Sequence, residues 1–248
     1  MRFFRRSIPF AIAAALACAA QTASAENASN PLAAVNNTDF RYQFYDLGGG
    51  FDQQDAIIDG AYMLRPNLKF KYEAHYYSTD VSGTRENELS RINLKGIYFP
   101  SEKKLNETWG VRTAVGLEWI LDFGDPAKGT GLGSDQIAPF GGLAFANLNT
   151  GLTLIPLIQH YESYNGPTDV SQTAIRLIAL QPFGEVYWAK LDLKLPYDWT
   201  NDVWPASAEV QLGKNLNDKI AIYGDLFVGL GRDRLYDYGI GVGLRFKY

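Results

Sequence analysis

The chain has 248 residues, of which 46% are hydrophobic and 14% aromatic, and its formal net charge is -4. The mean hydropathy is only -0.17, and after residue 20 no apolar run approaches the ~20 residues of a membrane-spanning helix. These values exclude a bundle of membrane helices, and the small net charge without a basic patch gives no reason to expect a nucleic-acid partner.

The first 25 residues have the pattern of a secretory signal peptide. A basic head at residues 2–6 precedes an apolar run at 8–20, and Ala23-Ser24-Ala25 places small residues at alternate positions. We expect cleavage after Ala25. An uncleaved anchor is disfavoured because the apolar run is too short. A lipoprotein is disfavoured because Ala15 stands where that pattern has a branched apolar residue before Cys18.

Cleavage after Ala25 removes Cys18, so the mature chain has no cysteine. Its two histidines, His75 and His160, are far apart in sequence, and no Gly-rich phosphate loop is present. The sequence therefore predicts no cofactor and no metal. Residues 26–38, rich in Asn and Ala, are predicted to be a flexible periplasmic lead-in to one domain at 39–248.

From residue 40 onward, apolar and polar residues alternate in short segments separated by turn-rich pieces, a pattern typical of β-strands. Their number is twelve, although a register change in the weaker segments would give ten or fourteen. The predicted strands are 40–47, 56–64, 68–77, 89–99, 109–121, 137–147, 152–161, 170–180, 186–195, 206–214, 220–229 and 235–248. Residues 122–135 form the longest irregular piece and are a candidate extracellular loop.

Within these segments, one face is apolar and the other carries charge. Trp119 and Leu117 alternate with Glu118, so the two faces are predicted to meet lipid and lumen. The candidate pore-lining residues are Arg112, Glu118, Arg176, Lys190, Asp192, Lys194 and Glu209. Candidate membrane-interface aromatics are Trp109, Trp119, Trp199, Trp204 and Tyr248.

The charged face has two interpretations. Fixed lumenal charges can select solutes, or facing rows can pair as structural salt bridges, for example Lys190 or Lys194 with Glu209. A barrel of about twelve strands is intermediate between filled and open, so pairing is favoured over solute selection but the choice stays open at this point.

The C-terminal segment Leu235–Tyr248 alternates strictly and ends on an aromatic residue. It resembles the assembly sequence of Gram-negative outer-membrane β-barrel proteins. The resemblance implies an all-β, transmembrane, antiparallel up-and-down barrel in the cell outer membrane, with outer-membrane lipid and the barrel-assembly machinery as partners. Its size and ending are similar to small porin-like channels, including porins of aromatic-compound degradation pathways and the nucleoside-channel type.

The resemblance implies a channel for passive uptake of small solutes. Two alternatives remain: a lipid-active barrel enzyme of the lipid A deacylase or phospholipase type, and a structural barrel with a plugged lumen. For the enzyme, His160 and Ser163 are the nearest candidates, but their spacing points them to opposite faces of a strand and does not match the His-x-Ser-Asn pattern.

Overall fold

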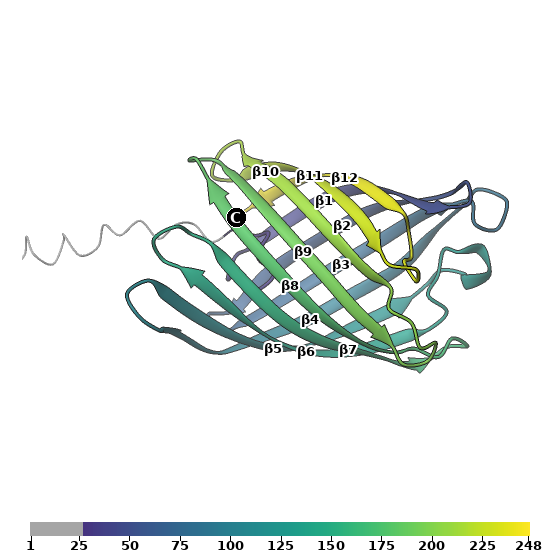
Figure 1. The fold of residues 1–248 in the computed structure, drawn as a ribbon, viewed down its shortest axis with the longest axis horizontal. Coiled ribbons are helices and arrows are strands. Elements are labelled where there is room, and N and C mark those ends of the chain that lie inside the picture. The colour runs from purple at the N-terminus through teal and green to yellow at the C-terminus, as the bar shows by residue number, and fades with distance from the viewer. Residues whose placement is uncertain (1–26) are drawn as a thin grey trace, which may run out of the picture.

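The computed structural model describes residues 27–248, which form a closed antiparallel barrel of twelve strands (Figure 1). Each strand pairs with its neighbours in sequence, and β1 pairs with β12 to close the ring. The predicted up-and-down barrel of twelve strands is confirmed, whereas the predicted signal peptide lies outside the described residues. The strands are β1 (Asn37–Gly48), β2 (Phe51–Arg65), β3 (Leu68–Thr79), β4 (Glu86–Lys104), β5 (Trp109–Asp122), β6 (Asp135–Asn147), β7 (Thr153–Asn165), β8 (Ser171–Phe183), β9 (Tyr187–Asp198), β10 (Ala206–Asn215), β11 (Ile220–Leu230) and β12 (Tyr238–Lys247).

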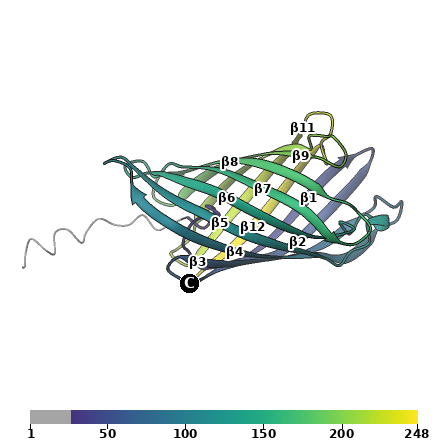
Figure 2. The ribbon, with the colours of Figure 1, turned by 90° about the horizontal axis from the view of Figure 1, so that it is seen from below.

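The strands are inclined to the long axis, and their connections gather at the two ends of the barrel (Figure 2). We call the end at which β1 begins and β12 ends the proximal end, and the other the distal end. The longest connection, residues 123–134, lies at the distal end and contains the short 3-10 helix Pro126–Lys128. Within residues 27–248, no helix is long and apolar enough to cross a membrane.

Alternation along each strand sends successive side chains to opposite faces of the wall. On β5, Trp119 is 44% exposed on the outer face, whereas neighbouring Glu118 is 4% exposed on the inner face. On β12, Ile240 and Val242 are exposed and Arg245 is buried. This is the apolar-out, polar-in arrangement of a membrane barrel.

Three glycines, in one turn and at one inward position, allow the backbone and a bulky ring to come close. Gly49 and Gly50 have φ values of 64° and 89° and form the two-residue turn from β1 to β2, a conformation that side-chain-bearing residues adopt rarely. Gly213 lies under the buried ring of Trp188, and a Cβ there would approach that ring to 2.0 Å. The bulky inner Trp188 therefore depends on a neighbour without a side chain.

The last strand begins at Tyr238 and not at Leu235, as the alternation had predicted. Residues 235–237 belong to the distal loop because the ring of Tyr236 packs on that of Tyr45, with centroids 4.9 Å apart. The amide of Asp237 donates to the carbonyl of Asp46 at 2.8 Å, outside the strand ladder. Tertiary packing at the barrel mouth thus overrides the local period.

The assignment of faces makes a testable prediction on β5. Val115 is exposed on the outer face, where Val115→Arg should destabilise the folded barrel by about 2–4 kcal/mol if it lies near the bilayer midplane. Glu118→Gln on the inner face should cost less, because the amide still accepts hydrogen bonds and the ammonium of its partner Lys95, 18% exposed, keeps contact with water in the lumen. Urea titrations of protein folded into liposomes measure both variants, and the opposite order of stability would mean that the faces are inverted.

Candidate functional site

The N-terminal segment, residues 27–36, lies inside the barrel. Leu32 and Ala33 are fully buried, and Leu32 packs in an apolar cluster on the inner wall. The other members of the cluster are inner-face side chains of β4 to β8, most of them in the proximal half of the lumen: Ile97, Phe99, Ala114, Phe140, Ala144, Ile155, Leu157 and Ile178. The segment enters this space directly before β1, so it narrows the lumen at the proximal end.

Polar side chains of the wall hold the segment in place. Lys69 Nζ donates to the carbonyl of Ala33 at 2.7 Å, and Arg112 Nη1 donates to the carbonyl of Leu32 at 3.0 Å. The Ser29 hydroxyl donates to Gln211 Oε1 at 2.6 Å and accepts from Arg245 Nη1 at 2.8 Å. These contacts come from four different strands.

The sequence had suggested a flexible lead-in for residues 26–38, but residues 29–33 are docked against the inner wall and β1 already begins at Asn37. The physical reason for this docking is that two compact turns satisfy backbone hydrogen bonds within the segment. Asn30 N donates to Asn27 O at 2.9 Å, and Ala33 N donates to Asn30 O at 3.1 Å. The free carbonyls of Leu32 and Ala33 then meet the basic groups of the wall.

All seven candidate pore-lining residues lie on the inner face, and most of them pair with each other. Arg176 forms a two-point ion pair with Asp192, with Nε to Oδ1 at 2.8 Å. Lys190 pairs with Glu209 at 2.6 Å. The larger set of inner-face ion pairs also includes Lys95–Glu118 at 2.8 Å, Arg112–Glu102 at 2.8 Å, Arg41–Asp59 at 2.7 Å and Lys71–Glu73 at 3.6 Å.

Two of the predicted residues differ from the rest in their partners. Glu118 is satisfied three times, by Lys95, by Gln159 at 2.5 Å and by Asn93 at 3.3 Å. Lys194 has no carboxylate within 4 Å among the described residues, and its Nζ lies 5.6 Å from the centre of the Tyr161 ring. Of the two pairings proposed for Glu209, the structure therefore contains the one with Lys190.

A charged cluster that the sequence did not predict joins the first and last strands. Asp39 on β1 lies directly opposite Arg245 on β12 in the strand register. Arg245 donates to both Asp39 oxygens, at 2.6–2.9 Å, and the Tyr223 hydroxyl donates to Oδ2 at 2.7 Å. Asp39 shares a strand face with Arg41, and this spacing could have identified it.

The predicted interface aromatics lie at both ends of the barrel. Trp119, Trp199 and Trp204 are exposed toward the distal end, and Tyr197 packs between the latter two at centroid distances of 4.5 and 4.9 Å. At the proximal end, Tyr248 is exposed and its ring lies 5.5 Å from that of Tyr62. Trp109 begins β5 there and is half-buried.

The two histidines have partners other than serine. His160 Nδ1 lies 2.9 Å from the Thr173 hydroxyl and its Nε2 lies 3.2 Å from Glu162. Ser163 instead donates to Asp169 at 3.3 Å. His75 pairs with Asp55 at 2.8 Å. Within residues 27–248, no histidine is hydrogen-bonded to a serine, and no cluster of three metal-ligating side chains occurs.

At the distal mouth, the long loop is tied to the barrel by charge. Lys128 Nζ donates to Glu88 Oε1 at 2.5 Å, and the Thr130 hydroxyl donates to Glu88 Oε2 at 2.8 Å. This hydrogen bond raises the pKa of the Lys128 ammonium above its usual value. The loop is therefore fixed along the rim next to β4.

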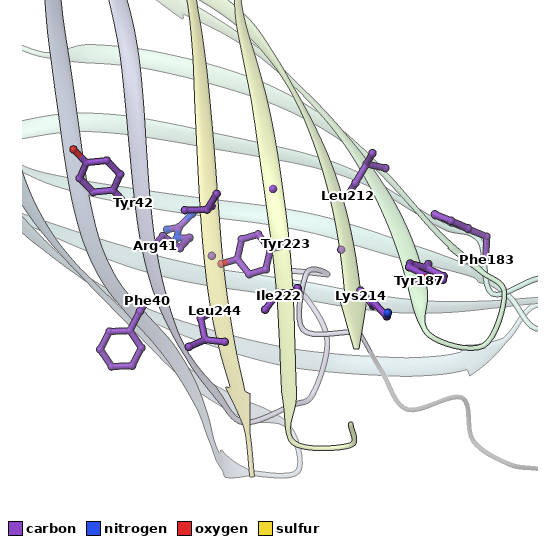
Figure 3. A pocket seen from close by; sticks show the side chains of 14 residues that line it. Phe40, Arg41, Tyr42, Phe183, Tyr187, Leu212, Lys214, Ile222, Tyr223 and Leu244 are labelled. Carbon is purple, nitrogen blue, oxygen red and sulfur yellow. The ribbon is translucent and has the colours of Figure 1, made fainter. Parts of the chain in front are cut away.

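A cavity of about 900 Å³ lies on the outside of the wall (Figure 3). Its rim is formed by outward side chains of β1 and β8 to β12, including Phe40, Tyr187, Leu212, Ile222 and Leu244. Gly224 has no side chain to fill the cavity at its position on the outer face. In a bilayer this apolar groove faces lipid, so it lies outside the solute path.

No protein-family model and no curated protein sequence matches the chain. Among solved structures, the NanC porin matches with a TM-score of 0.61 at 13% identity, covering 86% of this chain and 100% of that one. An outer membrane channel from Pseudomonas putida F1 matches with a TM-score of 0.61 at 11% identity, covering 92% and 99%. The KdgM porin matches with a TM-score of 0.58 at 10% identity, covering 86% and 99%. At these identities the likeness shows the fold, which is that of small outer-membrane porins and channels.

Proposed function

We propose that the protein is an outer-membrane channel for passive uptake of small polar solutes, exported with cleavage after Ala25. Its proximal end then faces the periplasm. Outer-membrane lipid surrounds the apolar outer face, and the barrel-assembly machinery engages the C-terminal strand. The solved barrels of the same fold include porins and a channel, and one KdgM structure is a complex with disordered oligogalacturonate.

The observation that carries this proposal is water access to charged groups inside the barrel. The side chain of Arg176 is 32% exposed although it projects into the lumen, and that of Arg41 is 23% exposed. A lumen built only for structural filling would bury such groups and pair them in a dry interior. We assign Arg112, Glu118, Arg176, Lys190, Asp192, Lys194 and Glu209 to the lining of the solute path.

The opposing candidate is a structural barrel whose lumen stays closed, which the docking of residues 27–36 favours. Planar-bilayer recordings of the full-length mature protein separate the two. A channel passes ions in discrete steps, and neutralising lumenal cations shifts its reversal potential toward cation preference, because fixed charge concentrates counter-ions.

The test variant is Arg176→Gln, and the expected result is a reversal potential closer to the Nernst potential of the cation under a salt gradient. Lys214→Gln is the control, since Lys214 is exposed on the outer wall. Protein that inserts normally but passes no current in any form would support the closed barrel. Unchanged selectivity in Arg176→Gln would remove this residue from the path.

A further inference from the structure

Two basic side chains in the lumen, Arg91 and Lys194, form no ion pair with any carboxylate of residues 27–248. Six other cations of the inner face have such partners: Arg41, Lys71, Lys95, Arg112, Arg176 and Lys190. Arg91 donates to the Tyr77 hydroxyl, and its Nη2 lies 3.4 Å from His75 Nδ1. Lys194 has only the face of the Tyr161 ring beside it.

Both side chains belong to one group in the distal half of the lumen. Arg91 is on β4, Tyr161 on β7, Arg176 on β8 and Lys194 on β9, each in the distal half of its strand. The Lys194 ammonium lies within electrostatic range of Arg176 and Arg91, and also of the carboxylates of Glu118 and Asp192. The Tyr161 hydroxyl lies within range of both guanidinium groups. Arg176 and Lys194 are directly opposite in the strand register, and like charges in this arrangement repel each other. Asp192 neutralises Arg176 in a two-point ion pair, whereas Lys194 has no such partner among residues 27–248.

Two carboxylates of this region, Asp192 and Glu118, are less exposed than their cationic partners. The side chain of Asp192 is 4% exposed against 32% for that of Arg176, and the side chain of Glu118 is 6% exposed against 18% for that of Lys95. The side chain of Glu209 is 21% exposed but pairs with Lys190. The other acids near Arg91 have partners of their own: Asp55 contacts His75, and Glu73 contacts Lys71. Within residues 27–248, the charges of Arg91 and Lys194 are therefore not neutralised by a direct ion pair.

We propose that Arg91 and Lys194, together with Tyr161, form a binding site for a small organic carboxylate, flanked by Arg176. A guanidinium binds a carboxylate through two parallel hydrogen bonds, and an ammonium adds a point charge. The ring of Tyr161 offers an apolar surface to the organic part of the ligand. This proposal names the solute class of the proposed channel and requires that solutes reach the lumen.

Equilibrium binding tests the site without requiring current. The full-length mature protein in detergent micelles is titrated against trifluoroacetate, and the fluorine NMR line width is recorded. Wild-type protein should broaden the trifluoroacetate line, and the broadening should reach saturation during the titration. Acetate should compete, whereas acetamide, which has a similar shape and no charge, should not.

The double substitution Arg91→Gln with Lys194→Gln should abolish the saturable broadening, and Lys194→Arg should retain most of it. Lys214→Gln is a matched control, because Lys214 also lies over a tyrosine ring, 5.4 Å from the centre of Tyr187, but on the outer face. Normal heat-modifiable migration in gels shows that each variant is folded.

Three results would overturn the proposal: no saturable broadening by wild type, equal broadening by the folded double variant, or stronger competition by inorganic phosphate than by acetate. Binding by a protein that passes no current would leave the site standing while the channel function fails. Current through a protein that shows no saturable binding would support the channel function and overturn the binding site.

Discussion

Deletion of residues 27–35 should increase the single-channel conductance several-fold. This segment fills part of the proximal lumen, with Leu32 and Ala33 fully buried among wall side chains. The deletion keeps Asn36, whose side chain accepts a hydrogen bond from the Met63 amide at 2.7 Å and so supports the start of the barrel. Planar-bilayer recordings in symmetric salt measure the change.

A point variant tests whether the N-terminal segment restricts the lumen without shortening the chain. Leu32→Asp removes the burial of a leucine, about 1.5–3 kcal/mol, and places a charge in an apolar cluster. Loss of burial alone shifts the ratio of undocked to docked segment by about one to two orders of magnitude. We expect longer open times at the conductance of the deletion variant.

Val35→Asp serves as the control, because Val35 is half-buried and is not part of the apolar cluster. It should change the open time less than Leu32→Asp. If the deletion variant and wild type had equal conductance, the segment would not be the constriction.

The alternation of apolar and polar residues along each strand predicts the barrel, because a wall between lipid and water needs one apolar and one polar face. Trp119 and Glu118 are neighbours in sequence and lie on opposite faces, as the alternation requires. The position of the N-terminal segment has no such local origin. Its anchors Lys69 and Arg112 are on β3 and β5, and a single leucine among Asn, Ala and Pro has no period.

Partner choice in the lumen was equally beyond the sequence. Glu209 is directly opposite Asp192, which makes Lys190 and Lys194 its two diagonal neighbours. Sequence spacing treats them as equivalent, and only the twist of the strands decides that Lys190 pairs at 2.6 Å. Lys194 is left opposite Arg176, and this arrangement creates the anion site proposed above.

Arg245→Met should destabilise the folded barrel by about 3–5 kcal/mol, the cost of leaving one partner of a buried ion pair alone. Asp39 and Arg245 are 1% and 7% exposed in their side chains and join β1 to β12, where the ring closes. Arg245 also holds Ser29 of the N-terminal segment. The loss of Arg245 therefore weakens both the junction of β1 with β12, which we call the seam, and the attachment of the docked segment 27–36.

Unfolding titrations in liposomes measure the effect, and a double-mutant cycle separates its parts. Asp39→Asn with Arg245→Met should be more stable than the sum of the single losses predicts, because the isolated charge is gone. Arg234→Met is the matched control: Arg234 pairs with Asp237 at the same 2.6 Å, but both side chains are more than 40% exposed. An exposed pair contributes about 0–1 kcal/mol. Equal losses for Arg245→Met and Arg234→Met would show that burial of the seam pair does not stabilise the closed ring.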